Sequence, residues 1–313
     1  MQQKRLQNIV TTSSFLLPVA AVLCALIWIY ANPTYELTHW IGLVFCTICT
    51  AFMVELNNTN MLIRVRTRMV GTTLLVLWTS CGFLHPFQTA HFAILCLLIC
   101  YHALMYIYQQ NHNTGTTFFI YACIGGISMI IQPLCILALA FFFVLGYFRA
   151  LSFKSFLAGL IGFFLPFWLV FSSCFLIDKT DLIIQYVSDY SQWIPFQYHT
   201  VNSHHVAAFT LLLLIVIPSV MHFIRNNFQD KIKVRMFFYF ILWMELVLTL
   251  GIIVLPHHFQ EFYLLLVMNS SPLIAHFLTL SNNKFSNYFF ITIVMLIAAL
   301  TIYTLWMPSF NFF

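Results

Sequence analysis

Apolar runs separated by short polar connections follow one another along almost the whole chain. Most of them are long enough for a helix of about 20 residues, which is what the hydrocarbon core of a bilayer requires. The pattern predicts an all-α, polytopic membrane bundle that forms one integral membrane domain over residues 1–313. The runs lie at residues 14–31, 38–54, 70–84, 88–108, 117–148, 154–177, 205–224, 236–254, 262–280 and 287–308.

The first run follows a basic start, as in a signal peptide, but it has the length of a full span and no small-residue cleavage site follows it. We interpret it as a retained first helix.

The run at 117–148 is too long for one ordinary crossing and short for two. It contains Gly125-Gly126 and then Gln132-Pro133, and proline suits the first turn of a new helix because it lacks a backbone donor. We expect a broken pair of short helices, either a hairpin that crosses twice or a re-entrant pair. Dividing this run raises the expected total from the ten runs above to about 11 membrane segments. The second half-helix would direct its positive end toward the outer half of the membrane, which suits an anion such as a phosphate.

The positions of lysine and arginine predict the orientation, because cytoplasmic connections carry an excess of both. With a broken pair at 117–148 and the N-terminus in the cytoplasm, Lys179 is the only one of the 13 basic residues outside. A single crossing at 117–148 would divide them almost evenly. The sequence therefore predicts a bacterial inner-membrane protein with its N-terminus inside and its C-terminus outside. The residues expected inside are Lys4, Arg5, Arg64, Arg66, Arg68, Arg149, Lys154, Arg225, Lys231, Lys233, Arg235 and Lys284.

Composition supports the membrane assignment and excludes nucleic acid as a partner. Charged residues make up 7% of the chain, against about 25% in ordinary soluble proteins. The net charge of +5 is spread over short connections rather than gathered in one basic surface. All nine cysteines lie in apolar runs, so no external disulfide framework is expected. Cys46 and Cys49 have CxxC spacing without a second pair, which favours packing between helices over metal binding.

On the predicted outer side, five residues are candidates for catalysis: Glu36, Asp178, Asp181, His257 and Glu261. In the stretch LPHHFQEF, His257 and Glu261 would share one face if the segment is helical. The longest connection, 178–204, is rich in Tyr and Trp and is expected to lie in the membrane interface. Imidazole and carboxylate groups at one surface suit general-base chemistry or metal binding. Without a spacing such as HExxH, the sequence leaves the metal content and any cofactor open.

Within the membrane, Glu245 lies near the middle of an apolar run. A carboxylate at that depth costs roughly 2.5–3.5 kcal/mol and usually faces a partner or a cavity. His102 is the partner that its estimated depth suggests. Such a pair would be either a proton relay or a protonated contact between helices. A further run contains Asn269, Ser270, Ser271 and Pro272, which predicts a kinked helix.

Residues 121–168 read YACIGGISMIIQPLCILALAFFFVLGYFRALSFKSFLAGLIGFFLPFW. This stretch resembles a family of uncharacterised multi-pass inner-membrane proteins of the Bacteroidetes type. It is more loosely similar to the middle region of glycosyltransferase-C enzymes, which use lipid-phosphate-linked sugars at the outer membrane face. That second resemblance implies an acidic catalytic residue in the first external loop, where Glu36 is the sole candidate in the short stretch NPTYEL.

Three functions remain open on the sequence alone. The first is a glycosyltransferase-C-like enzyme of cell-envelope biogenesis that acts on a polyprenyl-phosphate-linked sugar. The second is a non-catalytic scaffold or accessory subunit that binds other envelope proteins. The third is a proton-coupled transporter, suggested by Glu245, His102 and the broken helix.

Overall fold

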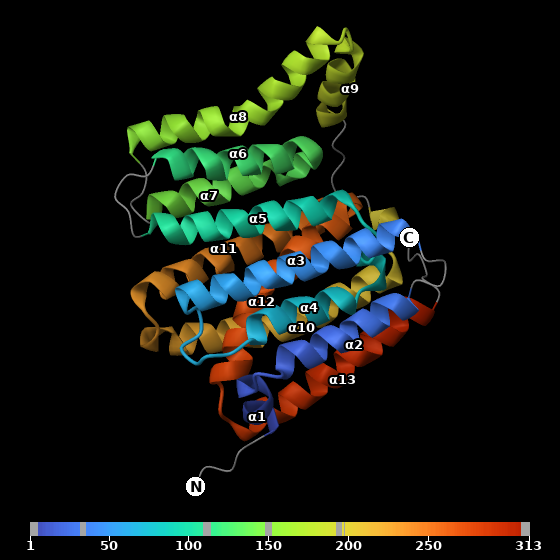
Figure 1. Ribbon diagram of the computed structural model, residues 1–313, viewed down its shortest axis with the longest axis vertical. Helices are drawn as coiled ribbons and strands as arrows, with labels where there is room; N and C mark the ends of the chain where they lie inside the picture. Colours follow the sequence, from blue (N-terminus) through green and yellow to red (C-terminus); the bar gives the residue numbers. More distant parts are fainter. Residues whose placement is uncertain are drawn as a thin grey trace.

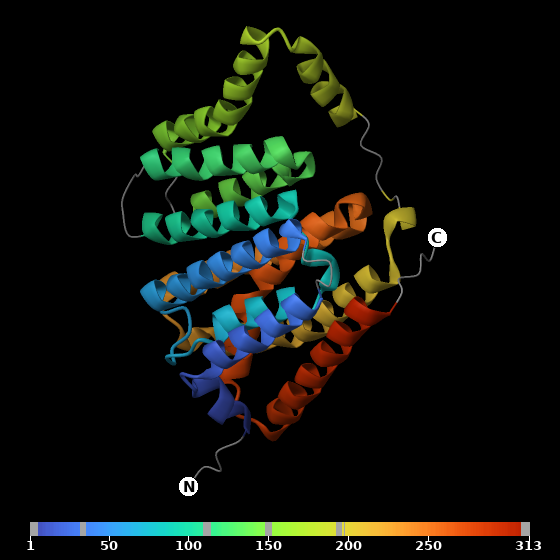
Figure 2. The same ribbon diagram turned by 45° about the vertical axis from the view of Figure 1, so that its right-hand side comes forward.

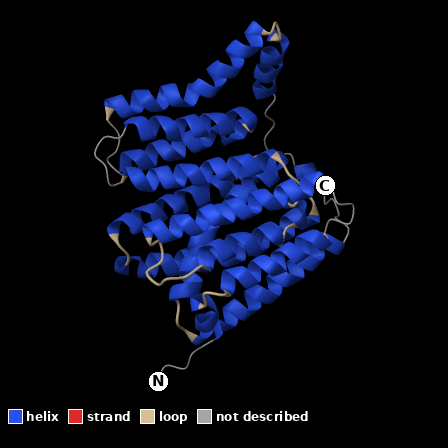
Figure 3. Ribbon diagram, viewed as in Figure 1, coloured by secondary structure: helices blue, strands red, loops and turns tan. Residues whose placement is uncertain are grey.

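The computed structural model describes residues 6–31, 36–108, 114–147, 152–191, 196 and 198–307. All regular secondary structure in this part of the chain is helical (Figure 3). The apolar runs of the sequence each contain a helix, and the run at 117–148 contains two. The prediction of an all-α fold is therefore confirmed. Lys4, Arg5 and Arg149, which contributed to the predicted orientation, lie outside the described residues.

Thirteen α-helices form the described part of the bundle (Figure 1). They are α1 (Leu6–Thr12), α2 (Leu16–Tyr30), α3 (Leu37–Asn60), α4 (Met69–Thr79), α5 (Thr89–Ile107), α6 (Thr114–Ile130), α7 (Ile136–Tyr147), α8 (Phe153–Leu176), α9 (Thr180–Ser191), α10 (Ser203–Asn226), α11 (Ile232–Val254), α12 (Phe259–Leu280) and α13 (Lys284–Trp306). Short 3₁₀ elements lie between them: η1 (Gly82–Leu84), η2 (Gln132–Cys135), η3 (Tyr198–Thr200), η4 (Asn227–Gln229) and η5 (Pro256–His258).

Seven of the described helices are long and apolar enough to cross a membrane: α3, α5, α8, α10, α11, α12 and α13. An eighth span is formed if α1 and α2, which are bent by 89° at their junction, count as one. Helices α4 and α6 and the η2–α7 segment are apolar but shorter. The chain is thus a multi-pass membrane protein by the length and composition of its helices.

The break expected within 117–148 is present. Helix α6 ends at Ile130, and Pro133 lies in the first turn of η2, which leads into α7. The phenol group of Tyr121 donates a hydrogen bond to the carbonyl oxygen of Ala138 (3.4 Å), so the two short helices pack against each other.

Most of the long helices run back and forth, so that many of their connections gather at two ends of the bundle (Figure 1). The α3–α4 and α10–α11 connections lie on the left in that view, and the α4–α5 and α11–α12 connections lie on the right. Each connection that the sequence assigned to the basic side, as far as the structure describes it, lies at the left or lower edge of the view.

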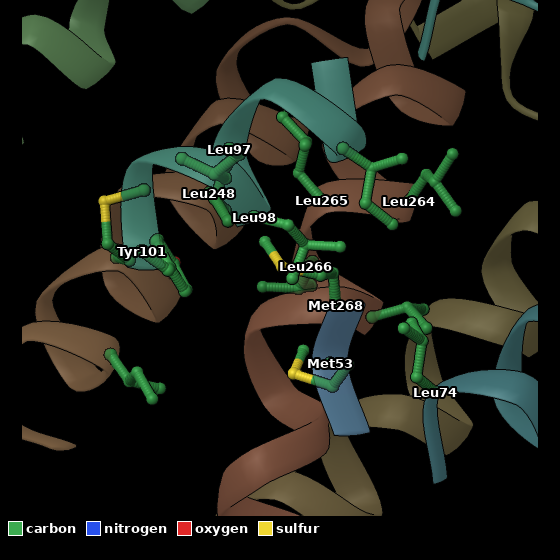
Figure 4. Packing of buried hydrophobic residues seen from close by; sticks show 14 of the residues in the cluster. Met53, Leu74, Leu97, Leu98, Tyr101, Leu248, Leu264, Leu265, Leu266 and Met268 are labelled. Atoms are coloured by element: carbon green, nitrogen blue, oxygen red, sulfur yellow. The ribbon is translucent and has the colours of Figure 1, made fainter. Parts of the chain in front are cut away.

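Helix α12 forms the centre of the bundle. Every residue from Phe262 to Leu278 is buried, so this helix has no lipid-facing stripe. Figure 4 shows Leu264, Leu265, Leu266 and Met268 of this helix among side chains from α3, α4, α5 and α11. Because lipid tails are as apolar as leucine, such packing stabilises the bundle through close van der Waals contact rather than through removal from water.

Helices α6 and α8 approach each other closely through glycine. A Cβ atom on Gly125 would lie 2.2 Å from the carbonyl oxygen of Phe163, and one on Gly162 would lie 2.4 Å from that of Phe118. This is the small-residue packing expected between membrane helices. The rest of α8 is largely exposed, and with α9 it forms an arch at one end of the molecule (Figure 2).

Candidate functional site: an apolar groove and the polar groups at its ends

A groove of about 690 Å³ lies between α7 and α11. A second hollow, of about 370 Å³, lies on the other side of α7, against α6 and α8, and Leu139 lines both. The larger groove is lined by Ile136, Leu139, Ala140, Phe143, Val144, Met236, Tyr239, Phe240, Trp243 and Val247. Apart from the phenol of Tyr239, the indole N–H of Trp243 and the thioether of Met236, these side chains offer hydrocarbon only.

The groove runs along the helices, because its lining residues recur on one face of each. From Met236 to Val247 helix α11 rises about 16 Å at 1.5 Å per residue. Trp243 is 64% exposed and Phe143 is 72% exposed. Since α11 is apolar enough to span a membrane, these rings face lipid and the groove is open to it.

One end of the groove lies beside α9. The side-chain amide of Gln132, at the start of η2, donates a hydrogen bond to the carbonyl oxygen of Tyr186 on α9 (3.3 Å). The phenol of Tyr186 donates in return to the carbonyl oxygen of Ser128 on α6 (3.5 Å). Helix α9 is amphipathic and follows the exposed residues Asp178 and Lys179. The described part of 178–204 thus contains an amphipathic helix, and its location in the membrane interface stays a prediction.

The candidate residues in LPHHFQEF are arranged differently from the expected pattern. Residues 256–258 form η5, and α12 begins only at Phe259, with His258 at its N-cap. The register therefore places Glu261 against His258 rather than His257, with 3.8 Å between His258 Nδ1 and Glu261 Oε1. His257 is exposed.

The other acidic candidates lie apart from this turn. Glu36 precedes α3 and its Oε2 lies 3.8 Å from Nδ1 of His39. Asp178 has a left-handed backbone conformation, with φ of 58°, at the apex of the arch, and Asp181 lies in the first turn of α9. Within the described residues no group of three or more His, Cys, Asp or Glu side chains is placed to hold a metal ion. The structure brings together Glu36 with His39 and Glu261 with His258, but not the two pairs.

His85 is buried in the connection between α4 and α5. Its ring stacks on Trp28 with 4.0 Å between centroids, and its Nε2 donates to the carbonyl oxygen of Thr79 (2.9 Å). Burial lowers the pKa of His85 to about 4. The hydrogen bond that its ring makes to the carbonyl oxygen of Thr79 opposes this shift in pKa, and the nearby His39 and His91 lower the pKa further. This residue is neutral in the folded protein at physiological pH.

Within the membrane, Glu245 has partners other than the expected one. Its carboxyl oxygens lie 2.6 Å from Nδ2 of Asn269 and 2.8 Å from Oγ of Ser270, both on α12. His102 instead directs its Nε2 at the carbonyl oxygen of Phe52 (3.1 Å). The expected His102–Glu245 pair does not form. Neighbouring residues on a helix point about 100° apart, so His102 and Tyr101 face different parts of the bundle. Tyr101, one position before His102, is the α5 residue that points toward Glu245 and its partners, and its phenol donates a hydrogen bond to Asn269 (2.6 Å).

A buried ionic cluster, which the sequence did not predict, lies at the end of the bundle opposite the α11–α12 connection. Asp230, in the α10–α11 connection, lies 3.0 Å from Nε of Arg64 and 3.0 Å from Nε2 of His276. Arg64 belongs to the α3–α4 connection and also binds Gln229. The sequence feature that could have indicated this cluster is a single acidic residue, Asp230, among the lysines and arginines at 225–235.

No family model, no curated protein and no solved structure matches this chain. The assignment of function therefore depends on the residues and geometry above.

Proposed function

We propose that this protein binds a polyprenyl-phosphate-linked sugar in the bacterial inner membrane and acts on it at the outer face, as an enzyme of envelope biogenesis. The groove between α7 and α11 carries the proposal. It follows α7 and α11, is open to lipid and is lined almost entirely by hydrocarbon, which is the chemistry that an isoprenoid chain requires. In this proposal the chain has about 11 membrane segments, its N-terminus in the cytoplasm and its C-terminus outside.

The polar head of such a lipid would lie at the end of the groove beside α9. Helix α7 begins there, with η2 before it, and the positive end of a helix favours phosphate. Asp178, Asp181 and Glu36 are the candidates for a general base, with His257, Glu261 and Lys179 as further groups at the same face. The described lysines and arginines other than Lys179 would face the cytoplasm, which supports this orientation.

A second function, a non-catalytic scaffold or accessory subunit for other envelope proteins, is favoured by a different observation. The candidate acids at the proposed outer face do not gather into one cluster: Glu36 lies against His39, and Glu261 lies against His258. A protein that kept the lipid groove without a joint catalytic site would bind lipid and partner subunits without turnover.

Mass spectrometry of the lipids that stay bound to the gently solubilised protein tests the proposal. The unmodified protein is compared with a variant in which a large side chain fills the groove. Ala140→Trp places an indole in the groove, and Ala51→Trp places the same group on the exposed surface of α3. We expect the unmodified protein and Ala51→Trp to retain a stoichiometric polyprenyl phosphate, and Ala140→Trp to lose most of it. Absence of that lipid from the unmodified protein, or its equal retention by Ala140→Trp, contradicts the proposal. A fixed set of partner subunits without the lipid supports the scaffold.

A further inference from the structure

Four side chains from three helices form a closed polar network in the middle of the bundle. Tyr101 belongs to α5, Glu245 to α11, and Asn269 and Ser270 to α12. All four are buried, and Asn269 and Ser270 are completely inaccessible. Because each hydrogen atom here can be assigned to one acceptor, the network reveals the protonation state of its carboxyl group.

The carbonyl oxygen of Ile241 fixes the orientation of Asn269. It lies 2.9 Å from Nδ2, and since a carbonyl can only accept, this atom must be the nitrogen. The second hydrogen of the same nitrogen is donated to Oε2 of Glu245 (2.6 Å). The remaining oxygen of Asn269 accepts from the phenol of Tyr101 (2.6 Å). The donors of Asn269 and Tyr101 are thereby used completely.

Ser270 has one hydrogen and two close oxygen neighbours. Its Oγ lies 2.5 Å from the carbonyl oxygen of Leu266 and 2.8 Å from Oε1 of Glu245. The carbonyl carries no hydrogen, so the closer contact requires the serine to donate to it. The contact with Glu245 then holds a hydrogen only if the carboxyl group supplies it.

We infer that Glu245 is a proton-binding site, with the proton on Oε1 and donated to Ser270. The complete series of hydrogen bonds then runs from the phenol of Tyr101 to Asn269 and from Asn269 to Glu245. It continues from Glu245 through Ser270 to the carbonyl oxygen of Leu266. Every group in it is neutral and paired, which is the condition for burying polar atoms in an apolar bundle at small cost.

An ionised Glu245 would have no cation to balance it within the described surroundings. Tyr101 is the titratable side chain that faces it from α5, and Cys100 interacts with Tyr101 in turn. From α12 the facing groups are the neutral Asn269 and Ser270. The ring of His102 is directed at Phe52 instead. Loss of the proton would therefore leave a bare charge between α11 and α12, and proton occupancy is coupled to the packing of these two helices.

Infrared difference spectroscopy of the protein in lipid tests this inference directly. A protonated carboxyl group has a carbonyl stretch separate from that of a carboxylate, and it shifts on exchange into D₂O. At neutral pH we expect such a band in the unmodified protein, its loss in Glu245→Gln, and its retention in Glu55→Gln, whose carboxyl group is exposed on α3. Glutamine retains the shape and neutrality of the acid, so this variant should fold.

Ser270→Ala provides a second measurement that does not depend on Glu245→Gln. Removal of the hydroxyl takes away the acceptor of the carboxyl proton, so the band should move toward the position of a free acid. A band that Glu245→Gln leaves in place, or the absence of any protonated carboxyl band at neutral pH, overturns the inference. Retention of polyprenyl phosphate by the protein is a separate measurement from this infrared band, so a failure of the inference and a failure of the proposed function are distinguishable.

Discussion

The Nε2 atom of His276 lies 3.0 Å from Oδ2 of Asp230, and both side chains are almost completely inaccessible. His276 lies near the end of the central helix α12, whereas Asp230 lies in the connection from α10 to α11. Arg64, from the α3–α4 connection, lies 3.0 Å from the other carboxylate oxygen. One acid thus joins three segments that are far apart in the sequence.

Replacing Asp230 by Asn should destabilise the protein. The change leaves Arg64 without its ionic partner and weakens the bond to His276, and removal of one member of a buried ion pair costs about 3 kcal/mol. Arg64 is 35% exposed, so water would offset part of this loss. We expect a clear fall in the midpoint of thermal unfolding in a mild detergent. Asp181→Asn, at an exposed position of α9, is the control; equal midpoints for the two variants would show that the cluster contributes nothing.

The contact between α6 and α8 offers a matched pair of adjacent glycines. Gly125→Ala should force the two helices apart, because the added methyl would lie 2.2 Å from the carbonyl oxygen of Phe163. Gly126→Ala meets no other atom within 4 Å and should stabilise α6 by up to about 1 kcal/mol through helix propensity. Thermal unfolding of both variants measures the difference. A Gly125→Ala protein as stable as Gly126→Ala would contradict the close packing described here.

The helices could be predicted from the sequence because apolar runs of membrane length have few alternatives to helix. The break before Pro133 was also predictable, since proline and the paired glycines mark it locally. The sharp bend between α1 and α2 was not. It depends on contacts such as the amide of Gln7 with the carbonyl oxygen of Leu278 (2.6 Å), which joins opposite ends of the chain.

The pairing of polar groups was predicted less well, for a geometric reason. Composition and run length indicate the depth of a residue in the membrane, but not the direction in which it points around its helix. His102 has a suitable depth, yet Tyr101 has the direction that reaches Asn269. Likewise, the start of α12 at Phe259 decides that His258, not His257, approaches Glu261. A register error of one residue is enough to change the partner.

Acidification should destabilise the protein through His85. Its pKa is about 4 in the folded protein and about 6.5 when exposed, so the unfolded chain binds the proton first as the pH falls. The contribution of His85 to stability is therefore constant above pH 6.5 and falls progressively between pH 6.5 and 4, by at most about 3.4 kcal/mol at 1.36 kcal/mol per pH unit. The unfolding midpoint of His85→Gln should depend less steeply on pH over this interval than that of the unmodified protein. Parallel pH profiles would exclude His85 as a source of the dependence.

The orientation of the chain can be measured with cysteine substitutions at exposed charged positions. Arg66, Lys154 and Lys179 are exposed in the structure, whereas the native cysteines are buried or half-buried. A maleimide that cannot cross membranes should therefore report only the introduced thiol in intact spheroplasts. We expect Lys179→Cys to be labelled directly, and Arg66→Cys and Lys154→Cys only after the membrane is permeabilised.

The comparison between Arg66→Cys and Lys154→Cys decides the nature of the broken segment. Helices α4 and α5 lie between these positions, together with α6 and α7. If α6 and α7 form a hairpin or a re-entrant pair, the two thiols lie on one side of the membrane; if they cross once as a bent span, the thiols lie on opposite sides. Labelling on opposite sides would also move Lys179 to the cytoplasm and remove α9 from the outer face. The proposed lipid headgroup site beside Gln132 would then have to be abandoned, whereas the proton site at Glu245 would remain.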